Sequence, residues 1–215
     1  MNLSQTTRFL FVLLLSIFAV ACSDNAAVSN SSSSSTATTM PTPKPAGTPV
    51  FDDEVAVFET DYGTFKVALY TDVAPRHVAN LKKLINEKFY DGLGFHRVIP
   101  DNIIQGGDPQ TRGGGNRAMW GMGDPNQPKV PAEFSTRPFK RGTLGMARTN
   151  DPNSASSQFF ITLRENPQWD GKYTVFGEVI SGINDVRVMS NAPADGDKVK
   201  DLPIIKRAYL EKRRQ

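Results

Sequence analysis

The chain has 215 residues, with 25 lysines and arginines against 22 aspartates and glutamates, which gives a net charge of +3. This length allows one domain of ordinary size with additional segments. The apolar content of 39% indicates that part of the chain does not pack into a core. The small basic excess argues against a dedicated nucleic-acid-binding protein, in which basic residues concentrate on one face. The single cysteine, Cys22, excludes a disulfide within these residues.

The first predicted element is an apolar run from Phe9 to Val20, which follows the positive charge of Arg8. A charged start, a short apolar run and small residues at its end are typical of a signal peptide, and the run is too short for a comfortable transmembrane helix. It ends in Ala19-Val20-Ala21-Cys22, which resembles a bacterial lipobox. We therefore predict a lipoprotein signal peptide over 1–21; the alternative is a plain secretory signal with an incidental cysteine.

The lipobox resemblance implies a diacylglyceryl thioether on Cys22 and a fatty-acylated amine such as a palmitoyl amide. Several acyl chains anchor a protein firmly where a single chain is marginal. We expect a location in the cell envelope, on a bacterial membrane. Ser23 favours the outer membrane facing the periplasm, whereas Asp24 leaves the inner membrane open. Residues 22–49 are rich in serine, threonine and proline, a composition that buries too little apolar surface to fold, and are predicted to be a disordered tether.

Residues 50–215 carry the pattern of a folded domain. Apolar alternation on both sides of Asp61-Tyr62-Gly63 predicts a β-hairpin. Pro75 opens a stretch in which apolar residues recur at helical spacing, and a second helix is expected from Ile183 to Met189. Short strands are predicted at 95–99, 103–108, 130–134, 142–147, 158–163, 174–180 and 204–210. Many short strands with few helices predict a mainly β domain that closes into an antiparallel barrel, because closure removes exposed edges.

Strand alternation predicts which side chains share the outer surface of this barrel. Gln158 and Phe160 have the same parity on one strand, and Ile103 and Gln105 have the same parity on another. Arg97 is expected on that surface too, because burying an unpaired charge is costly. An arginine, two glutamines, an isoleucine and a phenylalanine are therefore predicted to lie together. Taken singly, Arg97 is also consistent with an ordinary surface residue, and Phe160 with a core residue.

The chain resembles the cyclophilins, a family of peptidyl-prolyl cis/trans isomerases, over about residues 54–211. Three segments carry the resemblance: Phe95-His96-Arg97-Val98-Ile99, Gln105-Gly106-Gly107-Asp108 and Ser157-Gln158-Phe159-Phe160-Ile161. It implies an eight-stranded antiparallel barrel capped by two α-helices, working as a monomer without cofactor, metal or nucleic acid. Two histidines and one cysteine also make no plausible zinc set. The expected substrates are proline-containing peptides and unfolded exported proteins.

The resemblance also implies roles for individual residues. Arg97 is expected to be catalytic, by donating a hydrogen bond to the prolyl nitrogen, while Gln105 orients Arg97 or holds a substrate carbonyl. No covalent intermediate is implied. The expected substrate-binding residues are Asn102, Ile103, Ala147, Arg148, Gln158, Phe160, Trp169 and Tyr173.

Asn102 departs from the family pattern, which usually has a phenylalanine at this position. We expect substrate binding to be weaker by about 1–2 kcal/mol because apolar area is lost. This departure leaves open a binding module, a holdase or scaffold with little turnover; a purely structural envelope lipoprotein would not need the set of Arg97, Gln105 and Phe160. His96 is expected to face inward with a satisfied hydrogen bond, and His77 to lie on the exposed side of its helix.

Overall fold

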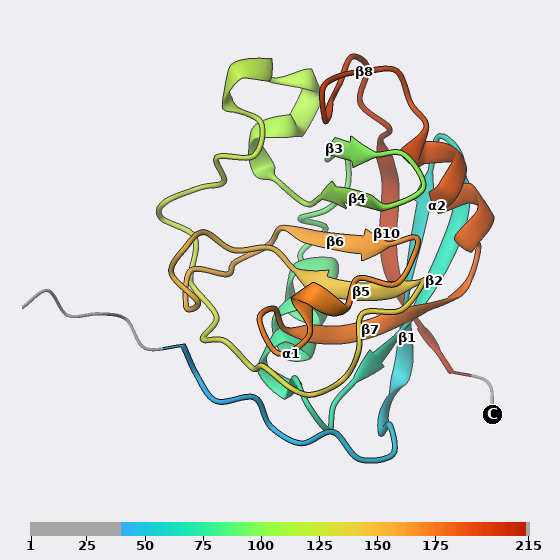
Figure 1. The fold of residues 1–215 in the computed structure, drawn as a ribbon. Helices are drawn as coiled ribbons and strands as arrows, with labels where there is room; N and C mark the ends of the chain where they lie inside the picture. The colour runs from blue at the N-terminus through green and yellow to red at the C-terminus, as the bar shows by residue number, and fades with distance from the viewer. Residues whose placement is uncertain (1–39, 214–215) are drawn as a thin grey trace, which may run out of the picture. The chain divides into compact units, whose positions relative to one another are not determined.

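The computed structural model describes residues 40–213, so the predicted signal peptide, Cys22 and the tether before residue 40 lie outside the described residues. The helices α1 (Pro75–Asn86) and α2 (Ile183–Ser190) lie at separate places beside a single β-sheet (Figure 1). Among the described helices, none has the length and apolar character needed to cross a membrane. Three short 3-10 helices lie in the connections: η1 (Pro109–Gly114), η2 (Arg117–Met119) and η3 (Pro167–Trp169).

The sheet contains ten strands, and all paired neighbours run antiparallel. The strands are β1 (Phe51–Thr60), β2 (Gly63–Tyr70), β3 (Phe95–Ile99), β4 (Ile103–Gly106), β5 (Thr143–Met146), β6 (Phe159–Thr162), β7 (Val175–Ser181), β8 (Ala194–Asp195), β9 (Lys198–Val199) and β10 (Ile205–Lys212). Their order across the sheet is β10-β1-β2-β7-β5-β6-β4-β3-β9-β8.

The expected closed barrel of eight strands is wrong. The sheet has ten strands, and within residues 40–213 its end strands β10 and β8 do not pair with each other. The outer edge of β3 pairs instead with β9, at Arg97 and Lys198. Near the start of β10 the chain is joined to residues 92–95 by an isolated bridge from Gly94 to Ile204 and by backbone hydrogen bonds, without a continuous strand pairing. The two extra strands have two residues each, too few for a periodic pattern to reveal them.

The predicted hairpin and both predicted helices are confirmed. The turn at Asp61 and Tyr62 joins β1 to β2, and α1 begins at Pro75, where proline pre-sets the helical φ. The core lies between the sheet and α1, and rings from β1, β2, β3, β6 and the turn after α1 contact each other there. These rings are Phe58, Phe65, Tyr90, Phe95 and Phe159. The apolar face of α1 consists of Val78, Leu81, Leu84 and Ile85, all buried.

The segment 130–134 is not the strand that its composition predicted. Only Val130 pairs, in an isolated bridge with Ala155. Pro131 cannot donate to a sheet, and the chain instead turns Glu133 towards the start of α1. Phe134 is buried nearby. The segment therefore caps the N-terminal end of α1 and does not extend the sheet.

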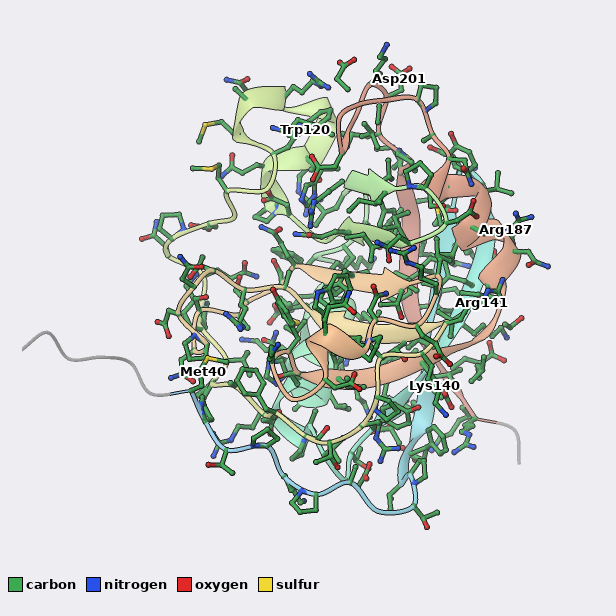
Figure 2. All side chains as sticks on the ribbon, viewed as in Figure 1. Met40, Trp120, Lys140, Arg141, Arg187 and Asp201 are labelled. Atoms are coloured by element: carbon green, nitrogen blue, oxygen red, sulfur yellow. The ribbon has the colours of Figure 1, made fainter. Side chains whose placement is uncertain are left out.

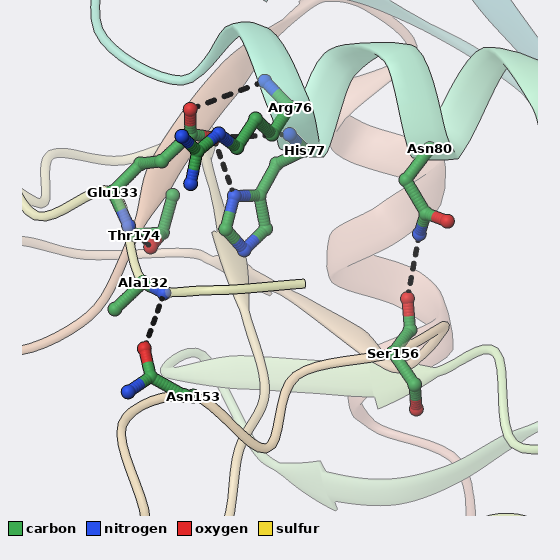
Figure 3. A network of polar contacts seen from close by, with 8 residues as sticks. All are labelled: Arg76, His77, Asn80, Ala132, Glu133, Asn153, Ser156 and Thr174. Atoms are coloured by element: carbon green, nitrogen blue, oxygen red, sulfur yellow. Dashed lines mark hydrogen bonds and ion pairs between the residues drawn. The ribbon is translucent and has the colours of Figure 1, made fainter. Parts of the chain in front are cut away.

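His77 is buried, contrary to the expected exposed position, because Glu133 provides it with a partner. His77 Nδ1 donates to Glu133 Oε2 at 2.7 Å, and the backbone N–H groups of Arg76 and His77 donate to the same carboxylate at 3.1 and 3.0 Å (Figure 3). These two N–H groups belong to the first turn of α1, where no helical carbonyl is available to them. The buried face of α1 therefore contains a polar residue with a hydrogen-bond partner, which the spacing of the apolar residues does not reveal.

Residues 40–49, which composition placed in the tether, contact the domain. Lys44 forms a parallel bridge with Ser135: its N–H donates to the Phe134 carbonyl at 2.7 Å, and its carbonyl accepts from the Thr136 N–H at 2.9 Å. Lys44 Nζ also donates to the Asp72 carbonyl at 2.8 Å. Prolines on both sides of Lys44 favour extended backbone, which suits this pairing.

Candidate active site

The sheet register aligns the central site residues in one row. Arg97 on β3 lies opposite Gln105 on β4, Gln105 lies opposite Phe160 on β6, and Phe160 lies opposite Gly145 on β5. Residues directly opposite each other in antiparallel strands point to the same face and have neighbouring Cβ atoms. The predicted grouping of Arg97, Gln105 and Phe160 on one face is therefore present.

A cavity of about 110 Å³ lies over this row. Eight of the ten predicted site residues line it: Arg97, Ile103, Gln105, Ala147, Arg148, Phe160, Trp169 and Tyr173. Phe160 is only 5% exposed, since the aromatic residues around it cover most of its ring. The cavity thus combines apolar walls with a guanidinium and an amide, the mixture expected of a site for a small apolar ring attached to a polar backbone.

Arg97 is held on two sides. Its Nε donates to Asp197 Oδ2 at 2.6 Å, and its Nη1 donates to Gln105 Oε1 at 3.5 Å. The Arg97 side chain remains 40% exposed. The hydrogen bond from Arg97 lowers the pKa of Asp197, so the carboxylate is ionised at neutral pH.

A chain of amide hydrogen bonds extends from Arg97 across the site. Gln105 Nε2 donates to Gln158 Oε1 at 3.0 Å, and Gln158 Nε2 donates to the carbonyl of Gly121 at 3.1 Å. Gln158 lies outside the 110 Å³ cavity and instead lines a neighbouring one of about 300 Å³. Gln105 borders both cavities, so its amide sits between them.

Aromatic rings build the apolar wall. The Phe160 ring stacks on Phe139 with centroids 5.6 Å apart, and it meets Trp169 and Tyr173 edge-on at 5.5 and 5.6 Å. Arg148 lies over the Tyr173 ring at 4.7 Å and donates to the Lys172 carbonyl. Contacts of this geometry stabilise aromatic clusters beyond their buried area. These contacts therefore hold the rings of the wall in place against one another.

Asn102 does not line either of these cavities. It is partly buried at the turn between β3 and β4, where its carbonyl accepts from the Leu163 N–H at 2.7 Å. Its Oδ1 is buried and has no partner among residues 40–213. The structure thus brings together nine of the ten predicted site residues, with Gln158 joined through Gln105, and leaves Asn102 beside the pocket.

Three residues of the site escaped the sequence reasoning: Phe139, Gly145 and Asp197. Phe139 supports Phe160 from behind and is held by its own N–H, which donates to Asp170 Oδ1 at 2.8 Å. Asp197 lies in a turn after Gly196, and the Gly196-Asp197 pair is a hairpin signal that points to this turn. Neither Phe139 nor Gly145 carries a comparable signal.

His96 is buried, as predicted, but its ring makes no hydrogen bond among residues 40–213, contrary to the expected satisfied one. Its Nδ1 is buried without a partner in the described part of the chain. Burial lowers the pKa of His96 to about 4, so the ring is neutral at pH 7. A neutral ring on the inner side of β3 does not compete with Arg97 for an anionic partner.

Other clefts and clusters in the described residues lack the features of this site. A cleft of about 540 Å³ lies over the neighbouring strands β10, β1, β2 and β7. It is lined largely by charged side chains, and two of these, Lys66 and Glu211, pair at 2.6 Å. The acidic side chains of Asp52, Asp53 and Glu54 converge in the manner of a metal site. Lysines already neutralise them, however, since Lys82 pairs with Asp52 and Glu54, and Lys212 pairs with Asp53.

Comparison with known proteins agrees with this site. A family model described as "Cyclophilin type peptidyl-prolyl cis-trans isomerase/CLD" matches residues 55–209. A Brucella suis protein named "Probable peptidyl-prolyl cis-trans isomerase" is 42% identical over 163 residues, which cover 74% of this chain and 83% of the relative. A Schizosaccharomyces pombe peptidyl-prolyl cis-trans isomerase is 40% identical over 71% of this chain and 96% of its own length.

A solved structure gives the same result. The cyclophilin-type isomerase of Cryptosporidium parvum, crystallised in the presence of the dipeptide Ala-Pro, superposes with a TM-score of 0.64 at 31% identity, covering 74% of this chain and 99% of its own. This chain belongs to the cyclophilin-type peptidyl-prolyl cis-trans isomerases. It is an enzyme that interconverts the cis and trans forms of Xaa-Pro peptide bonds.

Proposed function

We propose that this isomerase assists the folding of exported proteins in the bacterial cell envelope, from a lipid anchor on Cys22. The observation that supports the catalytic part is the placement of the Arg97 guanidinium at the rim of an aromatic pocket lined by Phe160. The presence of Ala-Pro with the related Cryptosporidium parvum enzyme supports proline-containing peptides as substrates. The envelope location rests on the lipobox-like Ala19-Val20-Ala21-Cys22.

The proposed mechanism uses hydrogen bonding alone. Amide resonance sets a barrier of about 18–20 kcal/mol to rotation of the peptide bond. In a twisted transition state the prolyl nitrogen becomes pyramidal, and its lone pair becomes able to accept a hydrogen bond. Arg97 donates to that lone pair, while the rings around Phe160 hold the proline. This contact exists only when resonance is broken, so it stabilises the transition state more than either planar form.

Exchange NMR on a short Ala-Pro peptide tests the role of Arg97. The parent protein should speed the exchange between cis and trans signals, and Arg97→Ala should reduce kcat about a hundredfold, as loss of one transition-state hydrogen-bond donor does elsewhere. A folded parent that binds the peptide without speeding exchange would instead support a binding module.

For the anchor, Cys22→Ala in the full chain should move the protein from the membrane to the soluble fraction.

A further inference from the structure

A small hairpin brings the acidic residue Asp197 into contact with Arg97. Strands β8 and β9 pair at Asp195 and Lys198 and leave Gly196 and Asp197 as a two-residue turn. Gly196 has a φ of +62° and occupies the first turn position, which type II′ hairpins reserve for glycine. The carbonyl of Asp197 accepts from the Val98 N–H at 2.8 Å. The backbone directly after Arg97 is thus tied to this turn.

Figures 1 and 2 place the hairpin at the same end of the domain as Trp120 and Asp201. Arg117 in η2 ties the hairpin to that end: it donates to the carbonyls of Lys198 and Val199 at 3.2 Å each and pairs with Asp195 at 3.0 Å. The turn is therefore braced from two sides. Its position does not depend on Arg97 alone.

Asp197 and Gln105 contact different nitrogens of the Arg97 guanidinium. Asp197 Oδ2 accepts from Nε at 2.6 Å, and Gln105 accepts from Nη1. Nη2 has no partner among residues 40–213, and the Arg97 side chain is 40% exposed. An arginine side chain has many rotamers, and fixing one of them costs conformational entropy. The hydrogen bond to the Asp197 carboxylate offsets this entropy loss before substrate binds. It also leaves Nη2 available to donate a hydrogen bond.

We propose that Asp197 is a positioning residue for catalysis: it holds the Arg97 guanidinium by Nε so that the terminal nitrogens face the pocket. This inference rests on the proposed role of Arg97. Asp197 touches neither the pocket nor the substrate, so it acts on the transition state through Arg97. Outer residues that orient a reacting group in this way change rate more than binding.

The full chain carrying Asp197→Ala or Asp197→Asn tests the proposal by exchange NMR on the Ala-Pro peptide. Asp197→Ala should lower kcat about tenfold and change KM less than twofold, because loss of orientation affects the transition state. Asp197→Asn keeps an acceptor for Nε and should restore kcat to within about threefold of the parent. The Arg97 Nε–H signal should move upfield and exchange faster with water in Asp197→Ala, a change that a general loss of stability does not produce.

Asp195→Ala is the matched control, because Asp195 lies in the same hairpin and pairs with Arg117 and Lys200 but does not touch Arg97. It should leave kcat within about twofold of the parent. In a background of Arg97→Ala, Asp197→Ala should have no further effect, since the two residues act as one unit.

Each other outcome overturns the inference in a recognisable way. If Arg97→Ala impairs catalysis and Asp197→Ala does not, Asp197 has no positioning role and the proposed function stands. If Asp195→Ala and Asp197→Ala impair kcat equally, the effect belongs to the hairpin and not to the ion pair. If Arg97→Ala leaves kcat unchanged, the proposed role of Arg97 fails, and the role of Asp197 fails with it.

Discussion

Gly145 contributes to the pocket by having no side chain. It lies opposite Phe160 in the sheet register, and the Phe160 and Phe139 rings occupy the space above it. A Cβ at this position would lie 2.7 Å from Cε1 of Phe139 and still closer to Phe160. Real side-chain contacts do not come this close, and the neighbours here are rings fixed by packing. The position of the Phe160 ring therefore depends on this glycine.

Gly145→Ala should displace Phe160 and destabilise the domain. We expect a loss of about 1–3 kcal/mol in the free energy of unfolding, as is usual when a well-packed core receives extra atoms. KM for the Ala-Pro peptide should rise several-fold because the proline wall is distorted. Urea unfolding and exchange NMR measure the two effects. Gly47→Ala is the control, since nothing lies within 4 Å of its added Cβ; equal effects in the two variants would contradict this account.

Helix α1 depends on a carboxylate that is distant in the chain. Its N-cap residue, Ala74, has no side chain able to accept a hydrogen bond, and Glu133 accepts from the N–H groups of Arg76 and His77 in its place. Burial acts to raise the pKa of Glu133, but the hydrogen bonds from His77 and Arg76 outweigh it and lower the pKa below its ordinary value. The loop at 130–134 thus acts as the cap of the helix.

Glu133→Ala should cost about 1–2 kcal/mol of stability at pH 7, because the first turn and the buried His77 lose their acceptor. The pH dependence has a definite sign. A carboxylate with a lowered folded pKa stabilises the fold above its unfolded pKa, and this contribution is lost as pH falls through the folded pKa. Urea unfolding at pH 7 and below pH 4 should therefore show a smaller difference between parent and variant in acid.

The control for this prediction lies at the other end of the same helix. Glu87 is exposed and pairs with Lys83 only at 3.9 Å, so Glu87→Ala should change stability by less than about 0.5 kcal/mol. A difference between parent and Glu133→Ala that grows in acid would contradict the capping role.

Elements with a clear periodicity or a turn signal were predictable. The hairpin at residue 61, the strand with Arg97 and the helix opened by Pro75 follow from alternation, helical spacing and proline position. The extra strands β8 and β9 were missed because two residues cannot show a period. The error at 130–134 has a different cause: its apolar residues pack without pairing, and its only sheet contact is an isolated bridge.

The candidate site was predictable where it lies on strands and unpredictable where it lies on loops. Alternation places Gln105 and Phe160 on the outer face because residues of a strand point to two faces only. The cost of burying an unpaired charge places Arg97 on the same face. Contacts between loops and strands have no such rule. The approach of Asp197 to Arg97 joins residues 100 positions apart, and Phe139 reaches Phe160 from an irregular segment. Asn102 was assigned by resemblance, and it does not line the cavity.

At the scale of the whole molecule, the domain extends further towards the N-terminus than its strands do. Lys44 is hydrogen-bonded through both its N–H and its carbonyl to the segment 134–136, and the Ala46 N–H donates to Thr136 Oγ1 at 2.9 Å. A serine- and proline-rich composition predicts none of this, because the contacts are made by the backbone. We therefore expect residues 40–49 to move with the domain.

Hydrogen exchange on the full chain tests this contact. The Lys44 amide should exchange at least about tenfold more slowly than the Gly47 amide, because the first donates to Phe134 and the second has no acceptor among the described residues. NMR or mass spectrometry with residue resolution measures both. Equal exchange at the two amides would show that residues 40–49 do not stay on the domain.

The pocket draws its lining from Arg97 through Tyr173, so it cannot exist before the chain is synthesised that far. All prolines except Pro193 and Pro203 precede Tyr173. A chain emerging from a ribosome therefore contains most of its own prolines before it has a pocket that could act on them. During synthesis, this enzyme can therefore isomerise the prolines of its own sequence only if another copy has already folded.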